Sequence, residues 1–381
     1  MVDVKHTCSI YKSNSDYTSN MCFCGMCSCN SGSKSVGSQS VENLVYEIVK
    51  PSFPCGEKLS NRRCFRRASK ILLIGSSGCG KSTVIKKLRM RFGRDISSRE
   101  KEETRLVVYE NIYSALACAI RELQAQGRLL DNADDGVIQT FWSNQEFGMT
   151  QSRWNCELLL SMRELCHRAI VLATALRFMN PESYLRMFLS SYSHVLQPEW
   201  NPTETDVIQC YVPTKSLSGA WISKDLIALE ANTKHTTQKE LSKIMPLVDG
   251  IVCVADISTL DYRYMVDPGK SQFNESLGLL EEVLGSRGPQ RKPIQLLLNK
   301  TDILRRKLKH LGVSLYSEGG LLQYFPGSAE SVAKCFKEHL GYCDEYYLRE
   351  ICALDATWMN HIFKVWREMM FKSKLLAAGV M

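Results

Sequence analysis

A glycine-rich stretch that follows the apolar run "KILLIG" has the residues needed to hold phosphate groups. Gly75, Gly80, Lys81 and Ser82 fit the pattern G-x-x-x-x-G-K-[ST]. Glycines let backbone amides approach phosphate oxygens without a Cβ atom in the way, while the lysine reaches the β- and γ-phosphates and the serine hydroxyl ligates magnesium. The residues expected to bind a nucleoside triphosphate are Gly75, Gly78, Cys79, Gly80, Lys81, Ser82 and Thr83.

A second motif, in "LLLNKTD", would select the base. Asn299, Lys300 and Asp302 fit N-K-x-D at the end of an apolar run. A carboxylate at Asp302 can accept hydrogen bonds from the N1 and N2 donors of guanine, whereas adenine would leave it unpaired at a large cost. The motif therefore predicts guanine and disfavours an ATP-using enzyme. The later stretch "EICALDAT" would supply backbone amides at Cys352 and Ala353 for the guanine O6.

Buried strands must position both motifs. "KILLIG" predicts a strand, and "KSTVIKKLRMRF" after the glycine-rich loop predicts a helix. Continuous apolar runs at 225–231, 249–258 and 293–300 predict strands covered on both faces, with enough chain between them for helices. These features indicate an α/β fold with a doubly wound, mostly parallel sheet. Between 97 and 203, apolar residues recur at helical spacing, which predicts an all-helical insertion.

Composition narrows the class of protein. The 381 residues carry a net charge of +8 and 44% apolar residues. No apolar run is long enough to span a bilayer, and the first residues lack the basic and then apolar pattern of a secretory signal. The sequence shows no basic segment interleaved with aromatic residues, so nucleic-acid binding is not expected. We expect residues 1–69 to form a flexible, cysteine-containing segment. Within it, "SVENLVYEIVKPSF" could form a short helix that Pro51 and Pro54 end.

Taken together, these stretches resemble the α subunits of heterotrimeric G proteins from about Lys70 to Met381. The 218 positions that separate Lys81 from Asn299 leave room for the helical insertion of that family. "PTETDVIQCYVPTKSLSG" resembles its linker and first switch, and "HIFKVWREMMFKSKLLAAGVM" resembles the last helix that its members present to receptors. The resemblance implies a Ras-like doubly wound P-loop GTPase domain at 70–96 and 204–381, with an all-helical insertion domain at 97–203.

The same resemblance assigns residues to the switches, and here the chain departs from the family. Thr214 would ligate magnesium, and Glu230 could act on magnesium through water. Tyr211 stands where the family has its catalytic arginine, and Lys234 stands where it has the glutamine that orients water. Thr233 replaces a glycine of the second switch. This implies a guanine-nucleotide-binding transducer, with Mg²⁺ and GTP or GDP as ligands, that hydrolyses GTP weakly. The alternative is a non-switching interaction module that kept the fold.

Partners are also implied by resemblance. A G-protein-coupled receptor and the βγ dimer are expected, although the family's long amino-terminal helix, which docks βγ, is poorly reproduced; no effector is indicated. Cys22 and Cys24 could carry palmitate, which would place the chain at the cytoplasmic face of the plasma membrane or in the cytoplasm. A metal site with Cys27 and Cys29 and an unmodified tail are the other interpretations. The basic cluster at 61–70 is either solvated surface or a contact for anionic lipid headgroups or another acidic partner.

Overall fold

The computed structural model describes most of the chain as two compact units. The described residues are 41–52, 61–92, 95–128, 135–143, 154–178, 185–210, 217–231, 238–260, 272–285, 292–310, 312 and 347–379. One unit is helical and spans Leu106–Trp200, and the described part of the other runs from residue 41 to Arg105 and from Asn201 to residue 379. Among the described residues, no helix is both long and apolar enough to cross a membrane.

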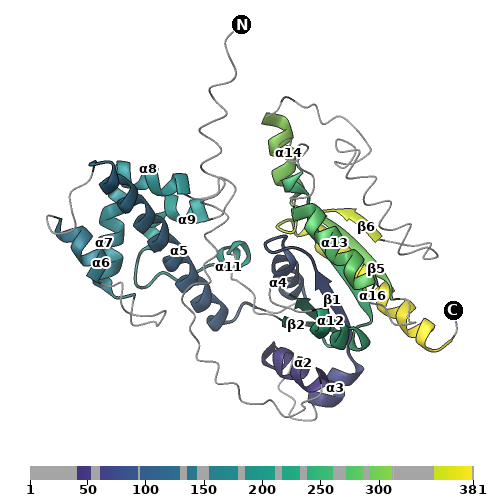
Figure 1. Cartoon of the computed structure of the whole chain (residues 1–381). Coiled ribbons are helices and arrows are strands. Elements are labelled where there is room, and N and C mark those ends of the chain that lie inside the picture. The colour runs from purple at the N-terminus through teal and green to yellow at the C-terminus, as the bar shows by residue number, and fades with distance from the viewer. Residues whose placement is uncertain are drawn as a thin grey trace, which may run out of the picture. The chain divides into compact units, whose positions relative to one another are not determined.

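The larger unit is built on a six-stranded sheet of order β2-β3-β1-β4-β5-β6. Its strands are β1 (Ser69–Ile74), β2 (Leu217–Ser223), β3 (Leu226–Ala231), β4 (Gly250–Asp256), β5 (Ile294–Asn299) and β6 (Tyr347–Glu350). The pairs β1–β3, β1–β4, β4–β5 and β5–β6 are parallel, and only the edge pair β2–β3 is antiparallel. The carboxyl ends of the parallel strands therefore meet at one edge of the sheet, where such folds place their ligands (Figure 1).

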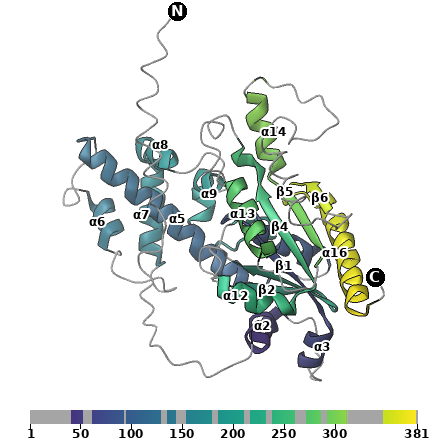
Figure 2. The same cartoon turned by 45° about the vertical axis from the view of Figure 1, so that its right-hand side comes forward.

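Helices cover both faces of this sheet (Figure 2). Because successive side chains of a strand point to opposite faces, β1 sends Leu72 and Ile74 into one apolar core and Ile71 and Leu73 into the other. The first core is closed by α2 (Val41–Val49), α3 (Asn61–Arg67), α12 (Gln238–Ile244), α13 (Gln272–Gly285) and α14 (Thr301–His310). The second is closed by α4 (Lys81–Arg91) and α16 (Thr357–Ala377).

Short elements complete this unit. They are α11 (Glu204–Gln209) and the 3₁₀ turns η1 (Lys50–Ser52), η3 (Met245–Leu247) and η4 (Ile257–Thr259). Thr203 begins α11 with a reciprocal capping box, in which its side chain accepts from the Asp206 amide and the Asp206 carboxylate accepts from the Thr203 amide. The cap holds the segment that leads into residues 211–216 in one orientation.

The helical unit packs around the long helix α5 (Ser98–Ala125), of which it contains the part from Leu106 onward. The others are α6 (Gly136–Ser143), α7 (Cys156–His167), α8 (Ala169–Phe178), α9 (Leu185–Ser190) and α10 (Tyr192–Val195). Aromatic contacts join them: Tyr113 of α5 stacks on Phe141 of α6 with ring centroids 4.4 Å apart. Asn155 caps α7 by accepting from the Leu158 amide.

The expected fold class, a doubly wound α/β sheet with an all-helical insertion, is confirmed, and strands lie in the apolar runs predicted for them. Two features differ. The edge strand β2 occupies the end of the stretch taken for a linker and switch. Within the segment predicted to be flexible, α2 and α3 are helices whose Val45, Val49 and Phe65 are buried in the core. The short helix expected in "SVENLVYEIVKPSF" is therefore confirmed as α2. The prediction of flexibility is wrong for α3, which the buried Phe65 holds against the core.

Candidate functional site

A tight loop joins β1 to α4 and exposes backbone groups at the carboxyl edge of the sheet. Gly75, Gly78 and Gly80 all have positive φ angles, of 141°, 76° and 108°. A Cβ atom at Gly75 would overlap the carbonyl oxygen of Val254 on β4, and one at Gly80 would overlap the Asn299 amide. The loop therefore needs glycine at these positions for its backbone angles and for its close approach to the neighbouring strands.

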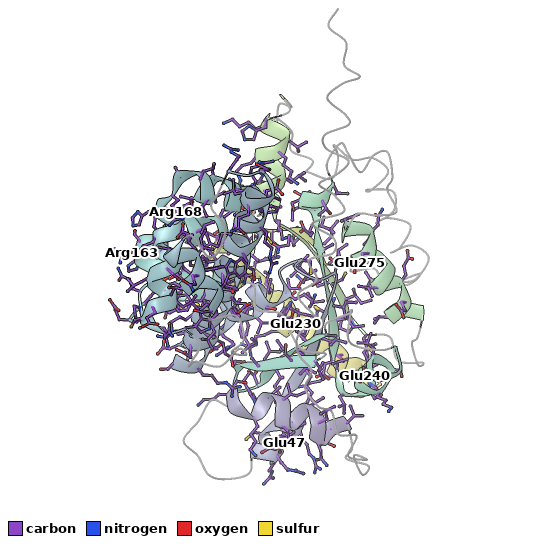
Figure 3. All side chains as sticks on the ribbon, turned by 60° about the vertical axis from the view of Figure 1, so that its left-hand side comes forward. Glu47, Arg163, Arg168, Glu230, Glu240 and Glu275 are labelled. Carbon is purple, nitrogen blue, oxygen red and sulfur yellow. The ribbon has the colours of Figure 1, made fainter. Side chains whose placement is uncertain are left out.

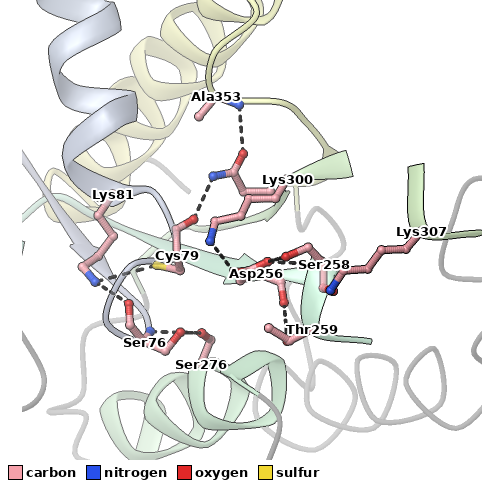
Figure 4. A network of polar contacts seen from close by, with 11 residues as sticks. Ser76, Cys79, Lys81, Asp256, Ser258, Thr259, Ser276, Lys300, Lys307 and Ala353 are labelled. Atoms are coloured by element: carbon pink, nitrogen blue, oxygen red, sulfur yellow. Dashed lines mark hydrogen bonds and ion pairs between the residues drawn. The ribbon is translucent and has the colours of Figure 1, made fainter. Parts of the chain in front are cut away.

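The lysine that follows the loop lies inside it. The Lys81 ammonium donates to the carbonyls of Gly75 at 2.8 Å and Ser76 at 2.9 Å, and the residue is only 5% exposed. The Ser76 amide donates in turn to the hydroxyl of Ser276 on α13, at 3.0 Å (Figure 4). Ser276 was not anticipated, because one serine in an amphipathic helix carries no sequence signal. It fixes the loop against α13.

The first turn of α4 faces the end of β3, which brings Ser82 to Glu230. The Ser82 hydroxyl lies 2.8 Å from both carboxylate oxygens of Glu230, and Glu230 is 5% exposed. Figure 3 shows Glu230 within the sheet unit. A hydroxyl and a carboxylate are the hard oxygen ligands that Mg²⁺ prefers, so this pair fits that ion. The contact between these two side chains is direct, and the expectation that Glu230 acts on magnesium through water stays a prediction.

Asn299 joins three segments of the site. Its side-chain amide donates to the Cys79 carbonyl of the glycine-rich loop at 2.8 Å, and its carbonyl accepts from the Ala353 amide at 2.9 Å (Figure 4). The residue is 2% exposed. The loop after β1, the end of β5 and the turn after β6 are thus held together, so the motif predicted to bind phosphate lies beside the motif predicted to select the base.

Lys300 adopts an uncommon backbone conformation, and its partly exposed side chain pairs with a buried carboxylate. Its φ angle is 66°, and its ammonium lies 2.5 Å from a carboxylate oxygen of Asp256 at the end of β4. Asp256 is 1% exposed and also accepts from the amide and the hydroxyl of Ser258. Asp256 is a second residue that the motifs did not predict, and it fixes the lysine of N-K-x-D.

The carboxylate expected to select guanine lies in the first turn of α14. The Asp302 side chain is 41% exposed and pairs with Arg306 at 3.7 Å. Cys352, in the turn after β6, is its neighbour: burial raises the pKa of that thiol, and the Asp302 charge raises it further. Cys352 therefore stays a neutral thiol beside the carboxylate.

Two further contacts tie α4 to the segments around it. Lys86 is largely buried, which lowers its pKa, and it donates to the Val207 carbonyl of α11 at 2.9 Å. Arg89 makes a two-pronged contact with Glu100 at 2.6 and 3.2 Å. The helix that carries Ser82 is thereby anchored to α11 through Lys86 and to the first turn of α5 through Arg89.

The structure brings most of the predicted site residues together and leaves others outside its description. The glycine-rich loop, Lys81, Ser82, Thr83, Glu230, Asn299, Lys300, Asp302 and Ala353 all lie at or near the carboxyl edge of the sheet. Outside the described residues lie Tyr211, Thr214, Thr233, Lys234 and the cysteines Cys22, Cys24, Cys27 and Cys29. No group of three or more His, Cys, Asp or Glu side chains that could hold a metal occurs in the described part of the chain.

Comparisons with known proteins agree with this geometry. A family model described as "G-protein alpha subunit" matches residues 56–370. The guanine nucleotide-binding protein alpha-3 subunit of Caenorhabditis elegans is 24% identical over 343 residues, covering 85% of this chain and 94% of the relative. The alpha-17 subunit of the same organism is 21% identical over 337 residues, covering 84% and 93%. A guanine nucleotide-binding protein subunit alpha of Cryptococcus neoformans is 25% identical over 278 residues, covering 70% and 61%.

Proposed function

Because the chain belongs to the family of G-protein α subunits, we propose that it binds GDP and GTP and acts as a nucleotide-dependent transducer in receptor-coupled signalling. The Asn299 side chain supports this best, since it holds the loop for phosphate against the motif for guanine. The loop amides and Lys81 would clasp the β- and γ-phosphates. Asp302 would accept hydrogen bonds from guanine.

Magnesium belongs to this proposal. Ser82 and Glu230 would hold Mg²⁺ in the described part of the site, and Thr214 would join them by its position in the sequence. The ion would neutralise charge on the phosphate oxygens. The chain's own contribution is the pair of oxygen donors that α4 and β3 present to each other at 2.8 Å.

We further propose that GTP hydrolysis is weak. Tyr211 stands at the position of the family's catalytic arginine and carries no guanidinium to stabilise the charge that develops in phosphoryl transfer. Lys234 stands at the position of the water-orienting glutamine, and a lysine ammonium has donors only. With both groups replaced, bound GTP would persist.

A nucleotide titration tests binding, base choice and metal dependence together. Purified full chain should take up fluorescent GDP and GTP analogues, GTP should displace them far better than ATP, and Mg²⁺ should tighten GTP binding. A protein that takes up neither nucleotide would refute the proposal. Single-turnover GTP cleavage, measured on the loaded protein, should be slow; phosphate release at the rate usual for the family would refute the claim of weak hydrolysis alone.

The second candidate function is a non-switching interaction module. Thr233 favours it, because a glycine normally allows the second switch to move toward the γ-phosphate. Limited proteolysis separates the two: a transducer should show different cleavage near residues 232–237 with GDP and with a GTP analogue, and a fixed module should show none.

The proposal extends to partners and location. A receptor would contact α16, and Cys22 and Cys24 would carry palmitate that holds the chain at the cytoplasmic face of the plasma membrane. Binding to βγ would rest on the segment around α2, which spans only nine residues. Labelling with a palmitate analogue, and its loss in a Cys22→Ser, Cys24→Ser variant, tests the acylation.

A further inference from the structure

Helix α2 packs on the edge strand β2 and takes no part in the nucleotide site (Figures 1 and 2). Its side chains Val45, Tyr46 and Val49 are 0%, 8% and 0% exposed and belong to the first apolar core. Leu44 lies on the outer face of the helix and is 50% exposed. The family model begins at residue 56, so α2 lies outside the part of the chain that this model matches.

The close fit between α2 and β2 depends on a glycine. A Cβ atom placed on Gly219 of β2 would lie 3.1 Å from a methyl carbon of Val49 and 2.7 Å from a methyl carbon of Leu229. Both distances are too short for ordinary van der Waals contact, so a glycine is needed for the helix to approach the strand this closely. The missing side chain at Gly219 thus makes the space that Val49 fills.

The turn that follows α2 also occupies the edge of the sheet. The Ser52 hydroxyl of η1 donates to the Val49 carbonyl at 2.9 Å and accepts from the Trp221 amide of β2 at 3.1 Å. Among the described strands, β2 has a neighbour on one side only. Because the unpaired amides of an edge strand can pair with another chain, η1 protects this edge, and Ser52 ties α2 to β2.

The hold of α2 on the sheet is slight for its length. The helix has nine residues, and so short a helix is marginal in water unless it is docked. Its polar contacts with α3 are exposed and therefore weak: Glu42 accepts from Arg66 at 2.7 Å, and Asn43 accepts from Arg62 at 3.1 Å. Three buried side chains must offset the ordering of nine residues. We therefore expect the docked and released states of α2 to be close in free energy.

The pattern of α2 shows which kind of ligand its place on the sheet accepts. The apolar side chains that pack on the core at helical spacing are Val41, Val45, Ile48 and Val49. This spacing, i, i+4, i+7 and i+8, is the one by which an amphipathic helix binds an apolar groove. The side of β2 and β3 beneath α2 therefore suits a helix that carries branched apolar side chains at the same spacing.

We propose that this place on the sheet is a docking site for an amphipathic helix of a partner protein, which displaces α2 from it. We call it the α2 surface and define it by Gly219 and Trp221 of β2 and Leu229 of β3. A methyl group of the partner's helix takes the position of Val49 beside Gly219. Neither a nucleotide nor an acyl chain takes part in the contact. The proposal thus goes beyond the proposed function and stands or falls separately from it.

Fluorescence anisotropy of a labelled peptide tests the proposal on the full chain. The peptide VENLVYEIVKPS, with the sequence of residues 41–52, takes the place of the partner's helix. The variant Val45→Asp should release the chain's own α2, because a carboxylate is costly to bury there. The peptide should bind this variant about tenfold more tightly than wild type, in which the tethered α2 competes at an effective concentration in the millimolar range.

A second variant loosens α2 without changing a residue of the α2 surface. Ser52→Ala removes the bond to the Trp221 amide. It should raise the affinity of the full chain for the peptide about fivefold, the factor that corresponds to one ordinary hydrogen bond. This variant decides the matter if circular dichroism shows that Val45→Asp is unfolded, and an unchanged affinity would then overturn the proposal.

The matched control is Leu44→Asp, which makes the same change at the neighbouring, exposed position of α2. It should bind the peptide like wild type, and a peptide with Asp in place of Val45 and Val49 should bind no variant. A folded Val45→Asp protein that does not bind the peptide, or equal binding by wild type and both Asp variants, would overturn the proposal. Dimerisation of Val45→Asp without peptide binding would also overturn it, in favour of pairing between the β2 edges of two copies.

Discussion

Replacing Asn299 by alanine should loosen the phosphate loop and the guanine motif at once. The side chain is 2% exposed and makes bonds of 2.8 and 2.9 Å to Cys79 and Ala353. Alanine leaves a buried carbonyl and a buried amide without this partner, and each orphaned group costs about 1–3 kcal/mol. We expect the free energy of unfolding to fall by about 2–4 kcal/mol.

The same change should weaken nucleotide binding. Every 1.4 kcal/mol of binding free energy changes the dissociation constant by a factor of about ten. Because part of the 2–4 kcal/mol loss comes from distortion of the phosphate loop, we expect the affinity for GDP to be about 10- to 100-fold lower. Urea unfolding followed by tryptophan fluorescence gives the first quantity, and titration with a fluorescent GDP analogue gives the second.

A control variant shows whether the effect is specific to Asn299 or follows from replacing an exposed asparagine elsewhere. Asn360 on α16 is exposed and accepts one hydrogen bond from Arg91, at 3.0 Å. Asn360→Ala should change stability by less than about 0.5 kcal/mol. If Asn299→Ala behaved like this control in both assays, Asn299 would not join the two motifs.

Three other changes should have distinct signatures. Glu230→Gln should make GTP binding about tenfold less dependent on Mg²⁺, because an amide carries no charge for the ion, and titration with and without Mg²⁺ measures it. Asp256→Asn should cost about 1–2 kcal/mol in urea unfolding, since Lys300 loses its buried partner but still reaches water; unchanged stability would contradict the ion pair. Burial raises the pKa of Glu100, but the two-pronged bond from Arg89 outweighs it and brings the pKa below 4.5. That stabilisation is present above pH 4.5 and is lost as the pH falls through the lower folded pKa, so wild type should lose stability relative to Glu100→Gln in that window.

The parts of the fold that sequence could predict are those with a strong local signal. Continuous apolar runs marked the strands that are covered on both faces, and Gly75 and Gly80 marked a turn that only glycine can make. The edge strand β2 has only half-buried residues at its start, so it lacks such a run. Helix α3 could not be predicted from an apolar pattern, because its sequence is mostly arginine and Phe65 is the one apolar side chain that anchors it.

The contacts that assemble the site are harder to foresee. Asn299 belongs to a recognisable motif, but the motif does not say that its amide reaches residue 79, 220 positions earlier. Ser276 and Asp256 belong to no motif, and only the packing of α13 and β4 against the loop reveals their roles. Propensity and periodicity describe one segment at a time, whereas these hydrogen bonds depend on which segments the sheet order makes neighbours.

The bond between Asn299 and Ala353 also bears on how the protein is made. During synthesis the glycine-rich loop leaves the ribosome early, yet its third anchoring segment follows β6, some 270 positions later. Contacts so distant in sequence form late, because a long stretch of chain must first be closed into a loop. A nascent chain arrested before residue 276 lacks the partners of the β1 loop on α13 and β5, so that loop should be open to proteases. The turn after β6 should join the site only once residue 353 has emerged.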